Sequence, residues 1–144
     1  MAGGESEGKR GRLLVVDDEE PQRLMLANIL ERAGFAVETA AEGREAMGRL
    51  EGGSFDLLLT DQRMPAMDGL ELLDRAHKLQ PRMPVVLLTA YGTVSTAVEA
   101  MKRGAADYLT KPFEREELLL VVEKVMRQQR LEDEVVSLRG ALRE

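Results

Sequence analysis

Three aspartates, a threonine and a lysine stand at the ends of apolar runs in this sequence. The residues at these run ends are Asp17 and Asp18 after LLVV, Asp61 after FDLLLT, Thr89 at the end of VVLLT, and Lys111 after DYLT. A carboxylate at the end of an apolar run is costly unless a metal, a cation or a reaction compensates it. If these side chains converge, they form an acidic site with one hydroxyl and one ammonium group.

Such a site has a definite chemistry. Crowded carboxylates repel one another and raise each other's pKa values. A hard divalent cation with oxygen ligands relieves that repulsion, and Mg²⁺ suits the site because it binds carboxylates while keeping several waters and a phosphate oxygen. A hydroxyl and an ammonium beside the metal stabilise a phosphoryl group in transit. Asp61 stands between the other groups, so we expect it to be the nucleophile that becomes an aspartyl phosphate.

Each residue also has an ordinary structural explanation when it is taken alone. A single Asp after a strand is commonly a turn former or a helix cap. An Asp-Asp pair before a helix complements the helix macrodipole, and Thr is a good strand residue. Their co-occurrence at four strand ends favours one shared chemical role over several separate structural ones.

The elements that must position these side chains alternate along the chain. Four runs are predicted as buried strands, at 13–16, 55–60, 85–89 and 107–110. A fifth, 35–39, alternates apolar residues with smaller or charged ones and is predicted to be an edge strand. Helical patterns fill the gaps between the strands. The third helix carries Leu79 on its apolar side, and the fourth has an apolar face framed by a Thr93 N-cap and a closing Gly104; that face consists of Val94, Ala97, Val98 and Met101.

Five strands that alternate with five helices, without a long structureless gap, predict an α/β fold. The expected architecture is a parallel sheet between two layers of helices, joined by right-handed crossovers. In open sheets of this kind, sites form outside the carboxyl ends of the strands. The acidic, hydroxyl and ammonium groups should therefore meet at one edge of the sheet.

Composition excludes several classes of protein. A chain of 144 residues suits one domain. The net charge of −6 and 3% aromatic content argue against direct nucleic-acid binding by this domain. The absence of cysteine and the single histidine exclude disulfides and a multi-histidine zinc site. Because there is neither a membrane-length apolar run nor a secretory signal, a cytoplasmic protein without membrane contact is expected.

The set VVDDEE, LLLTDQRMPAMDG, VVLLTAYG and DYLTKPF is similar to the receiver domain of two-component response regulators, over residues 12–127. The resemblance implies a flavodoxin-like (βα)5 fold with strand order 2-1-3-4-5. It implies a signalling switch rather than an enzyme acting on other substrates. In that switch Asp61 accepts a phosphoryl group from a sensor histidine kinase, with Mg²⁺ as cofactor.

The resemblance also assigns roles to the metal ligands. Asp18 would ligate Mg²⁺ directly, Asp17 would act mainly through a bound water, and Asp61 would complete the carboxylate set. Arg63, two residues past the acceptor, would lend its backbone carbonyl to the metal.

Further roles implied by the resemblance concern the phosphoryl group and the response to it. Thr89 and Lys111 would each bind a phosphoryl oxygen, and Lys111–Pro112 would be a cis peptide bond. Tyr108 matches the aromatic switch position, which is expected to turn inward when Thr89 moves toward the phosphate. The output surface would be the face built from the fourth helix, the fifth strand and the fifth helix.

Two bulky side chains flank the expected phosphoryl position. We hypothesise that Arg63 and Tyr91 orient or restrict the hydrolytic water and so set the lifetime of the phosphorylated state. The alternative is that both side chains point into solvent without a role.

The two ends of the chain have different characters. Residues 1–11 are predicted to be a flexible leader, and 128–144 a helical linker that extends the fifth helix. Apolar residues spaced 4, 3 and 4 apart form a heptad seam in the linker: Leu131, Val135, Leu138 and Leu142. A solvated helix end is the alternative, because fewer than two heptads are present. We expect a linker that supports a parallel homodimer and leads to an effector domain absent from this chain.

The stretch YGTVSTAVEAMKRGAADYLTKPF resembles receivers of sigma-54-dependent, nitrogen-regulation-type transcriptional activators.

Two other classes of protein fit the residues less well. A phosphatase of the haloacid dehalogenase type also uses Asp, Thr, Lys and Mg²⁺, but its family pattern requires an acid two residues after the nucleophile, where this chain has Arg63. Glu20 lies two residues beyond Asp18, but without that family's surrounding pattern. A flavodoxin-like cofactor binder would need a first loop that accepts phosphate, whereas DDEEPQ would repel it.

Overall fold

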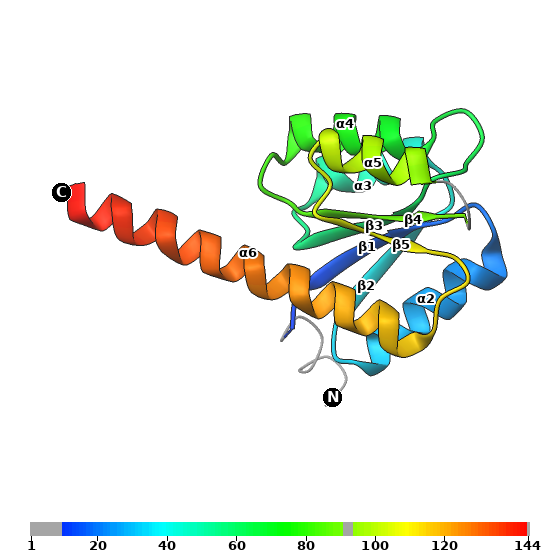
Figure 1. Ribbon diagram of the computed structural model, residues 1–144, viewed down its shortest axis with the longest axis horizontal. Coiled ribbons are helices and arrows are strands. Elements are labelled where there is room, and N and C mark those ends of the chain that lie inside the picture. Colours follow the sequence, from blue (N-terminus) through cyan, green and yellow to red (C-terminus); the bar gives the residue numbers. More distant parts are fainter. Residues whose placement is uncertain (1–9, 91–93, 144) are drawn as a thin grey trace.

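Five short apolar runs form one parallel sheet, which the computed structural model shows for residues 10–90 and 94–143 (Figure 1). The strands lie in the order β2-β1-β3-β4-β5, which confirms the predicted α/β, flavodoxin-like topology. Their bounds are β1 (Arg12–Val16), β2 (Ala36–Ala40), β3 (Leu57–Asp61), β4 (Val85–Thr89) and β5 (Asp107–Thr110).

Burial follows the predicted hydrophobic pattern of the strands. Every residue of β3 and β4 is buried, as expected for central strands covered on both faces. β2 is only partly buried and lies at one edge of the sheet, which confirms the edge-strand prediction. β3 begins two residues later than predicted, because Asp56 closes the preceding turn: its Oδ2 accepts a hydrogen bond from the backbone N–H of Arg12 at 2.8 Å. The strand also ends one residue later than predicted, so Asp61 is its last residue.

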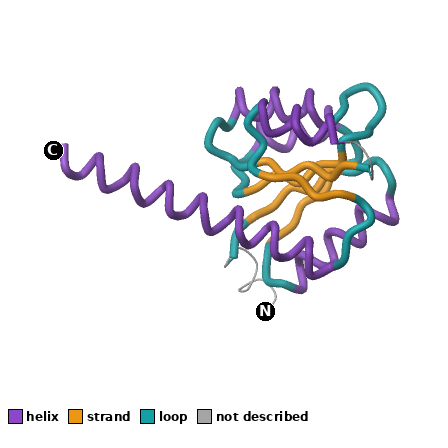
Figure 2. The backbone as a smooth tube through the Cα atoms, in the orientation of Figure 1, coloured by secondary structure: helices purple, strands orange, loops and turns teal. Residues whose placement is uncertain are grey.

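Helices cover both faces of the sheet (Figures 1 and 2). One layer contains α2 (Glu20–Arg32) and α6 (Arg115–Arg143), and the other contains α3 (Gly43–Gly52), α4 (Gly69–Leu79) and α5 (Val94–Lys102). Alternate β1 residues supply the two cores: Leu14 and Val16 pack toward the second layer, and Leu13 and Val15 toward the first. None of the described helices has the length and apolarity to cross a membrane.

The orientation of α5 differs from the sequence prediction. Of the predicted apolar face only Ala97 is buried, while Val94, Val98 and Met101 are 72%, 48% and 44% exposed. Ala97 and Ala100 are the buried residues of α5. Their small side chains let the helix backbone approach the sheet, and the bulkier apolar side chains of α5 face solvent. Leu79, at the end of α4, is also exposed rather than buried.

The sequence predicted an N-cap residue and a closing glycine for α5. Gly104 lies two residues past Lys102 with a φ of +101°, as expected for a helix-closing glycine. The predicted N-cap, Thr93, lies outside the described residues.

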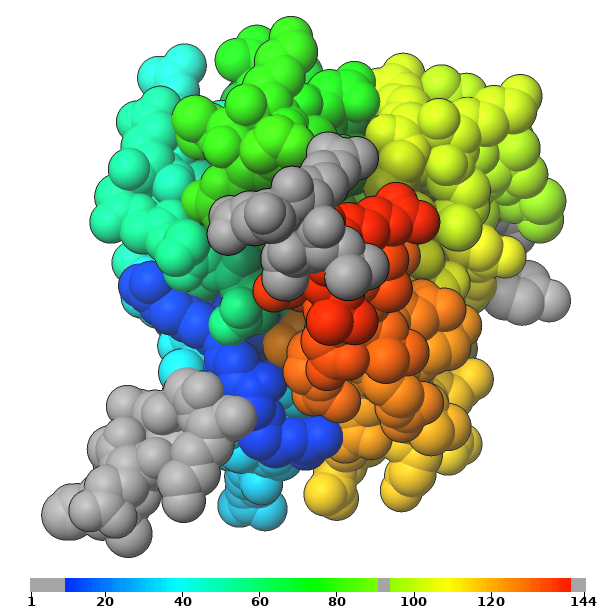
Figure 3. Space-filling model, turned by 90° about the vertical axis from the view of Figure 1, so that its left-hand side faces the viewer, coloured from blue at the N-terminus to red at the C-terminus, as the bar shows by residue number. Residues whose placement is uncertain are grey.

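The second half of α6 projects beyond the sheet, and Figure 3 views the molecule toward that projecting end. Among the α6 residues whose side chains are described, Val125 and Met126 are the last that are buried. An ion pair between Arg82, in the turn before β4, and Asp133 joins the projecting part to the domain. The predicted seam residues with described side chains are exposed: Leu131, Val135 and Leu138.

Candidate acidic site at the carboxyl edge of the sheet

The turn between β1 and α2 carries the first two carboxylates. Asp17 is completely buried, and its backbone N–H donates to the carbonyl of Ala40 at 3.2 Å. One carboxylate oxygen, Oδ1, accepts from the backbone N–H of Glu19 at 2.9 Å. The other, Oδ2, is buried without a hydrogen-bond partner among the described residues. Asp18 follows with an exposed side chain. The turn therefore aims one unsatisfied buried oxygen and one accessible carboxylate at the sheet edge.

Asp61 and Lys111 come from two further strands and meet beside this turn. Asp61 ends the central strand β3 and is 7% exposed. Its Oδ1 lies 3.0 Å from Nζ of Lys111, which is 4.0 Å from Oδ2 of Asp17. One carboxylate oxygen from each of Asp17, Asp18 and Asp61 lies within 4.8 Å of the others. The predicted convergence of the three acids and the lysine is therefore present.

The end of β4 supports the lysine. Thr89 is buried, and its carbonyl accepts a hydrogen bond from the backbone N–H of Lys111 at 2.7 Å. The peptide bond between Lys111 and Pro112 is cis. The threonine at the end of β4 and the lysine directly after β5 are thus neighbours at the carboxyl edge of the sheet.

Burial and neighbouring charge both act on the Asp17 carboxyl. Burial raises the pKa of its carboxyl above the ordinary value, and the nearby charges of Asp61 and Asp18 raise it further. The Glu19 amide and the Lys111 ammonium act in the opposite direction. A single ammonium group cannot balance three carboxylates, so the site favours a bound cation.

The donor set fits Mg²⁺. All three side chains offer hard carboxylate oxygens, and one of these oxygens is buried without a partner. Mg²⁺ prefers such oxygens, binds through few carboxylates and keeps several waters. Asp17, Asp18 and Asp61 are the residues that could hold it.

The loop after β3 turns the chain away from the carboxylate. Met64 is buried and anchors the loop, and Ala66 adopts a positive φ of 69°. Asp68 then caps α4 by accepting a hydrogen bond from the backbone N–H of Glu71 at 2.9 Å. Gly69 lies so close to the strand end that a Cβ there would stand 2.6 Å from the carbonyl oxygen of Asp61. This approach brings the first turn of α4 directly against the backbone of the acidic site.

Gly69→Ala is therefore expected to destabilise the fold. The added methyl would meet two rigid backbone groups, so we expect the free energy of unfolding to fall by about 1–3 kcal/mol in urea denaturation. Gly48→Ala is the matched control, since Gly48 also lies in a helix but a Cβ there meets nothing within 4 Å. Helix propensity predicts a gain of about 0.5–1 kcal/mol for this control. Equal effects of the two substitutions would contradict the steric explanation.

The remaining predicted residues lie farther from the acids or outside the described chain. The side chain of Arg63 is exposed, and Tyr91 lies outside the described residues. Tyr108 is 39% exposed and lines a groove with residues of α5, among them Val94 and Val98. The aromatic ring thus faces the surface rather than the site.

Two contacts of the site were missed from the sequence. Gln62, next to Asp61, accepts a hydrogen bond from the backbone N–H of Leu70 through its side-chain oxygen at 3.0 Å. Arg23 donates from Nη1 to the backbone carbonyl of Asp17 at 2.8 Å. A signal for Arg23 exists in the sequence, because a cation near the start of a helix opposes the macrodipole and calls for a local acceptor.

The fold and the site together define a class: a flavodoxin-like domain with an acidic cluster and a lysine at its carboxyl edge. Comparison with known proteins agrees. The family model described as the response regulator receiver domain matches residues 13–123. The chain therefore belongs to the response regulator receiver domain family. This is a family of receiver domains, not of enzymes.

Individual relatives are longer regulators. Regulatory protein AtoC of Escherichia coli is 41% identical over 131 residues, which cover 91% of this chain and 28% of AtoC. Transcriptional regulatory protein FixJ of Bradyrhizobium diazoefficiens is 40% identical over 119 residues, 83% of this chain and 58% of FixJ. The chain thus spans less than two thirds of these relatives. DNA-binding transcriptional regulator NtrC of Salmonella typhimurium, 40% identical over 82% of this chain and 25% of NtrC, agrees with the predicted resemblance to nitrogen-regulation-type activators.

Solved structures give the same picture. NtrX from Brucella abortus superimposes with a TM-score of 0.86 at 36% identity, over 89% of this chain and 29% of that one. A CheY-like receiver domain protein from Methanospirillum hungatei gives a TM-score of 0.80 at 36% identity, over 84% of this chain and 97% of that one.

Proposed function

We propose that this domain is a phosphorylation switch in which Asp61 accepts a phosphoryl group from a sensor histidine kinase, with Mg²⁺ as cofactor. The observation that carries the proposal is the placement of Asp61. Its carboxylate ends a rigid central strand, 3.0 Å from the Lys111 ammonium and within 4.8 Å of two further carboxylates. An exposed loop rather than a core element follows it, which leaves a path for a partner's side chain.

The transfer itself needs little covalent chemistry from the protein. An Asp61 carboxylate oxygen forms a bond to phosphorus while the phosphorus–nitrogen bond of the partner's phosphohistidine breaks. The electron pair of that bond returns to the imidazole, which takes up a proton from solvent. Bound Mg²⁺ would neutralise charge on the phosphoryl oxygens. Asp17, Asp18 and the Arg63 backbone carbonyl would hold it together with Asp61.

Thr89 and Lys111 would receive the phosphoryl oxygens. The Lys111 ammonium already lies against the acceptor carboxylate, so it can pair with a phosphoryl oxygen without a large movement. The Thr89 hydroxyl would donate a hydrogen bond to another oxygen, and its shift toward the phosphate would free space for Tyr108 to turn inward. Phosphorylation would thus bias a two-state element at the ends of β4 and β5.

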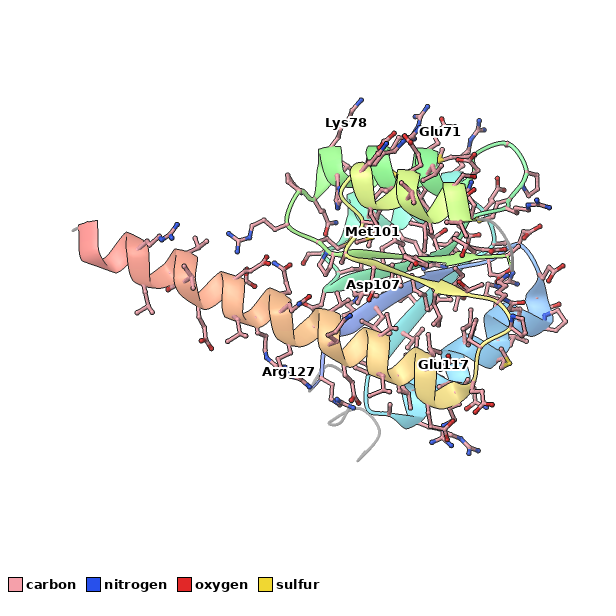
Figure 4. All side chains as sticks on the ribbon, viewed as in Figure 1. Glu71, Lys78, Met101, Asp107, Glu117 and Arg127 are labelled. Atoms are coloured by element: carbon pink, nitrogen blue, oxygen red, sulfur yellow. The ribbon has the colours of Figure 1, made fainter. Side chains whose placement is uncertain are left out.

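The proposed output surface is the α5–β5–α6 face; of the residues labelled in Figure 4, Met101 lies on α5, Asp107 on β5 and Glu117 on α6. The exposed apolar side chains of α5 lie on it beside Tyr108. Exposed apolar patches of this kind commonly mark interaction sites. We infer that phosphorylation changes this face to promote homodimerisation, supported by the seam on α6, and to control an effector domain. The regulator relatives favour a transcriptional effector.

The direct test of phosphorylation is the mass of the intact chain after incubation with Mg²⁺ and a small phosphodonor such as acetyl phosphate. A gain of one phosphoryl group that disappears when Mg²⁺ is chelated is expected. An unchanged mass in the presence of both reagents would overturn the proposal.

Val98→Lys tests the output surface. A charged side chain in the apolar patch should weaken dimerisation of the phosphorylated chain at least about tenfold, measured by analytical ultracentrifugation, with no change in phosphorylation. Leu24→Lys is the matched control, because Leu24 is a comparably exposed apolar residue, at 56%, on α2 in the opposite layer. Equal weakening by both substitutions would place the dimer contact elsewhere.

A further inference from the structure

The backbone carbonyl of Asp17 marks the place where β1 stops pairing with β3. The register between the two strands runs as far as Val16 opposite Thr60. The next carbonyl, that of Asp17, instead accepts a hydrogen bond from Nη1 of Arg23 at 2.8 Å. A side chain thus supplies the donor at the level of the carboxylate cluster, where the neighbouring strand no longer pairs.

Arg23 reaches this carbonyl from the first turns of α2. Its own backbone N–H donates to the carbonyl of Glu19 at 2.9 Å, so the residue is fixed within the helix. A guanidinium near the positive end of a helix is electrostatically unfavourable unless it finds an acceptor. The carbonyl of Asp17 is that acceptor. Arg23 therefore ties the start of α2 back onto the end of β1 and closes the turn between them.

The closed turn orients the Asp17 carboxylate and fixes the backbone position of Asp18. Asp17 is held at its backbone N–H by Ala40, at Oδ1 by Glu19 and at its carbonyl by Arg23. Asp18 is the next residue of the same turn, so the backbone that Arg23 holds also fixes the position from which its exposed side chain extends. Without Arg23, the buried carbonyl would lose its donor and the turn would relax to find another.

We propose that Arg23 is a positioning residue for Mg²⁺, one that holds Asp17 and Asp18 at the separation the ion requires. This inference rests on the proposed function, since it concerns the metal of the same site. The Arg23 side chain affects Mg²⁺ affinity in two opposite ways. As a cation Arg23 repels Mg²⁺, and as a hydrogen-bond donor it pre-organises the ligands. Its removal therefore tightens Mg²⁺ binding if charge dominates and weakens binding if positioning dominates.

The test is an NMR-monitored Mg²⁺ titration of the chain and its variants, without a phosphodonor. For Arg23→Ala we expect the dissociation constant to rise about tenfold, equivalent to ~1.4 kcal/mol. Arg23→Lys retains a donor and should give an intermediate value. Arg32→Ala is the matched control, because it removes the same charge from the exposed far end of α2. It should leave the constant within about twofold of the wild-type value.

A second readout separates positioning from general destabilisation. At saturating Mg²⁺ the rate of phosphorylation by acetyl phosphate should be within about twofold of wild type for Arg23→Ala, while the Mg²⁺ concentration for half-maximal rate rises. Binding in Arg23→Ala that equals that of Arg32→Ala, or is tighter than wild type, overturns the positioning role. Failure of the wild-type chain to bind Mg²⁺ would instead overturn the proposed function itself.

Discussion

Asp61→Asn is expected to abolish the gain of one phosphoryl group that the wild-type chain shows with Mg²⁺ and acetyl phosphate. The carboxamide has the shape of the carboxylate but lacks an anionic oxygen to attack phosphorus. We expect the rate of phosphorylation to fall by more than about a thousandfold, as is usual when a nucleophile is removed. The fold should persist, because the side-chain oxygen can still accept a hydrogen bond from Lys111, which lies 3.0 Å away in the wild type. Intact-mass spectrometry over a time course measures both the extent and the rate.

The matched control for this substitution is Asp68→Asn. Asp68 lies in the loop that follows Asp61 and caps α4 through Oδ1. Asparagine caps helices about as well as aspartate, so this variant should gain the phosphoryl group at the wild-type rate. Retained phosphorylation in Asp61→Asn, or its loss in Asp68→Asn, would move the acceptor to another residue.

All five strands could be predicted from the sequence, most clearly the central ones, because burial on both faces leaves a continuously apolar run. The continuously apolar runs before Asp17 and Asp61 can only be covered strands in a chain that also alternates with helices. Parallel strands place their carboxyl ends at one edge of the sheet, so the acids meet there, while the strand order itself was implied by the resemblance to receiver domains. Convergence of the three acids was therefore predictable from local patterns alone, although their distances were not.

The orientation of α5 could not be predicted in the same way. Periodicity identifies the face that carries large apolar residues, and here that face includes Val94 and Val98, which are exposed. The buried face is marked by Ala97 and Ala100, whose weak hydrophobicity gives little signal in a sequence. Large apolar residues turned outward indicate a surface kept for binding rather than for the core. The error thus identifies the patch on which the proposed output depends.

Contacts between residues far apart in the chain also could not be predicted from the sequence. The late start of β3 depends on a hydrogen bond between Asp56 and Arg12, which are 44 residues apart. The close approach of Gly69 to the carbonyl of Asp61 likewise requires the packed position of α4. Such contacts depend on how the helices and strands pack together, which a local sequence pattern does not determine.

Asp17→Asn is expected to strengthen the Mg²⁺-free fold while it weakens Mg²⁺ binding. The wild-type carboxyl is fully buried, Oδ2 has no hydrogen-bond partner among the described residues, and its pKa is raised first by burial and then by neighbouring charge. Asparagine keeps the acceptor for the Glu19 amide and removes the charge. At pH 7 without Mg²⁺ we expect the free energy of unfolding to rise by on the order of 1 kcal/mol, because a buried charge is removed. The Mg²⁺ dissociation constant should increase more than about tenfold.

Asp18→Asn is the control that separates the two effects. Asp18 belongs to the same cluster, but its side chain is exposed. Its substitution should therefore weaken Mg²⁺ binding without a comparable gain in the stability of the Mg²⁺-free chain.

The pH dependence of the Asp17→Asn effect follows from the direction of the pKa shift. The unfolded carboxyl releases its proton near the ordinary value of 3.8, and the folded one releases it at a higher pH. Within that window the folded chain binds more protons than the unfolded chain, so wild-type stability falls as pH rises. The advantage of Asp17→Asn in urea unfolding with a chelator should thus grow from about pH 4 upward and reverse in saturating Mg²⁺. If Asp17→Asn is no more stable than wild type at neutral pH without Mg²⁺, the buried Asp17 carboxylate does not destabilise the Mg²⁺-free fold. Its burial would then not favour binding of a cation.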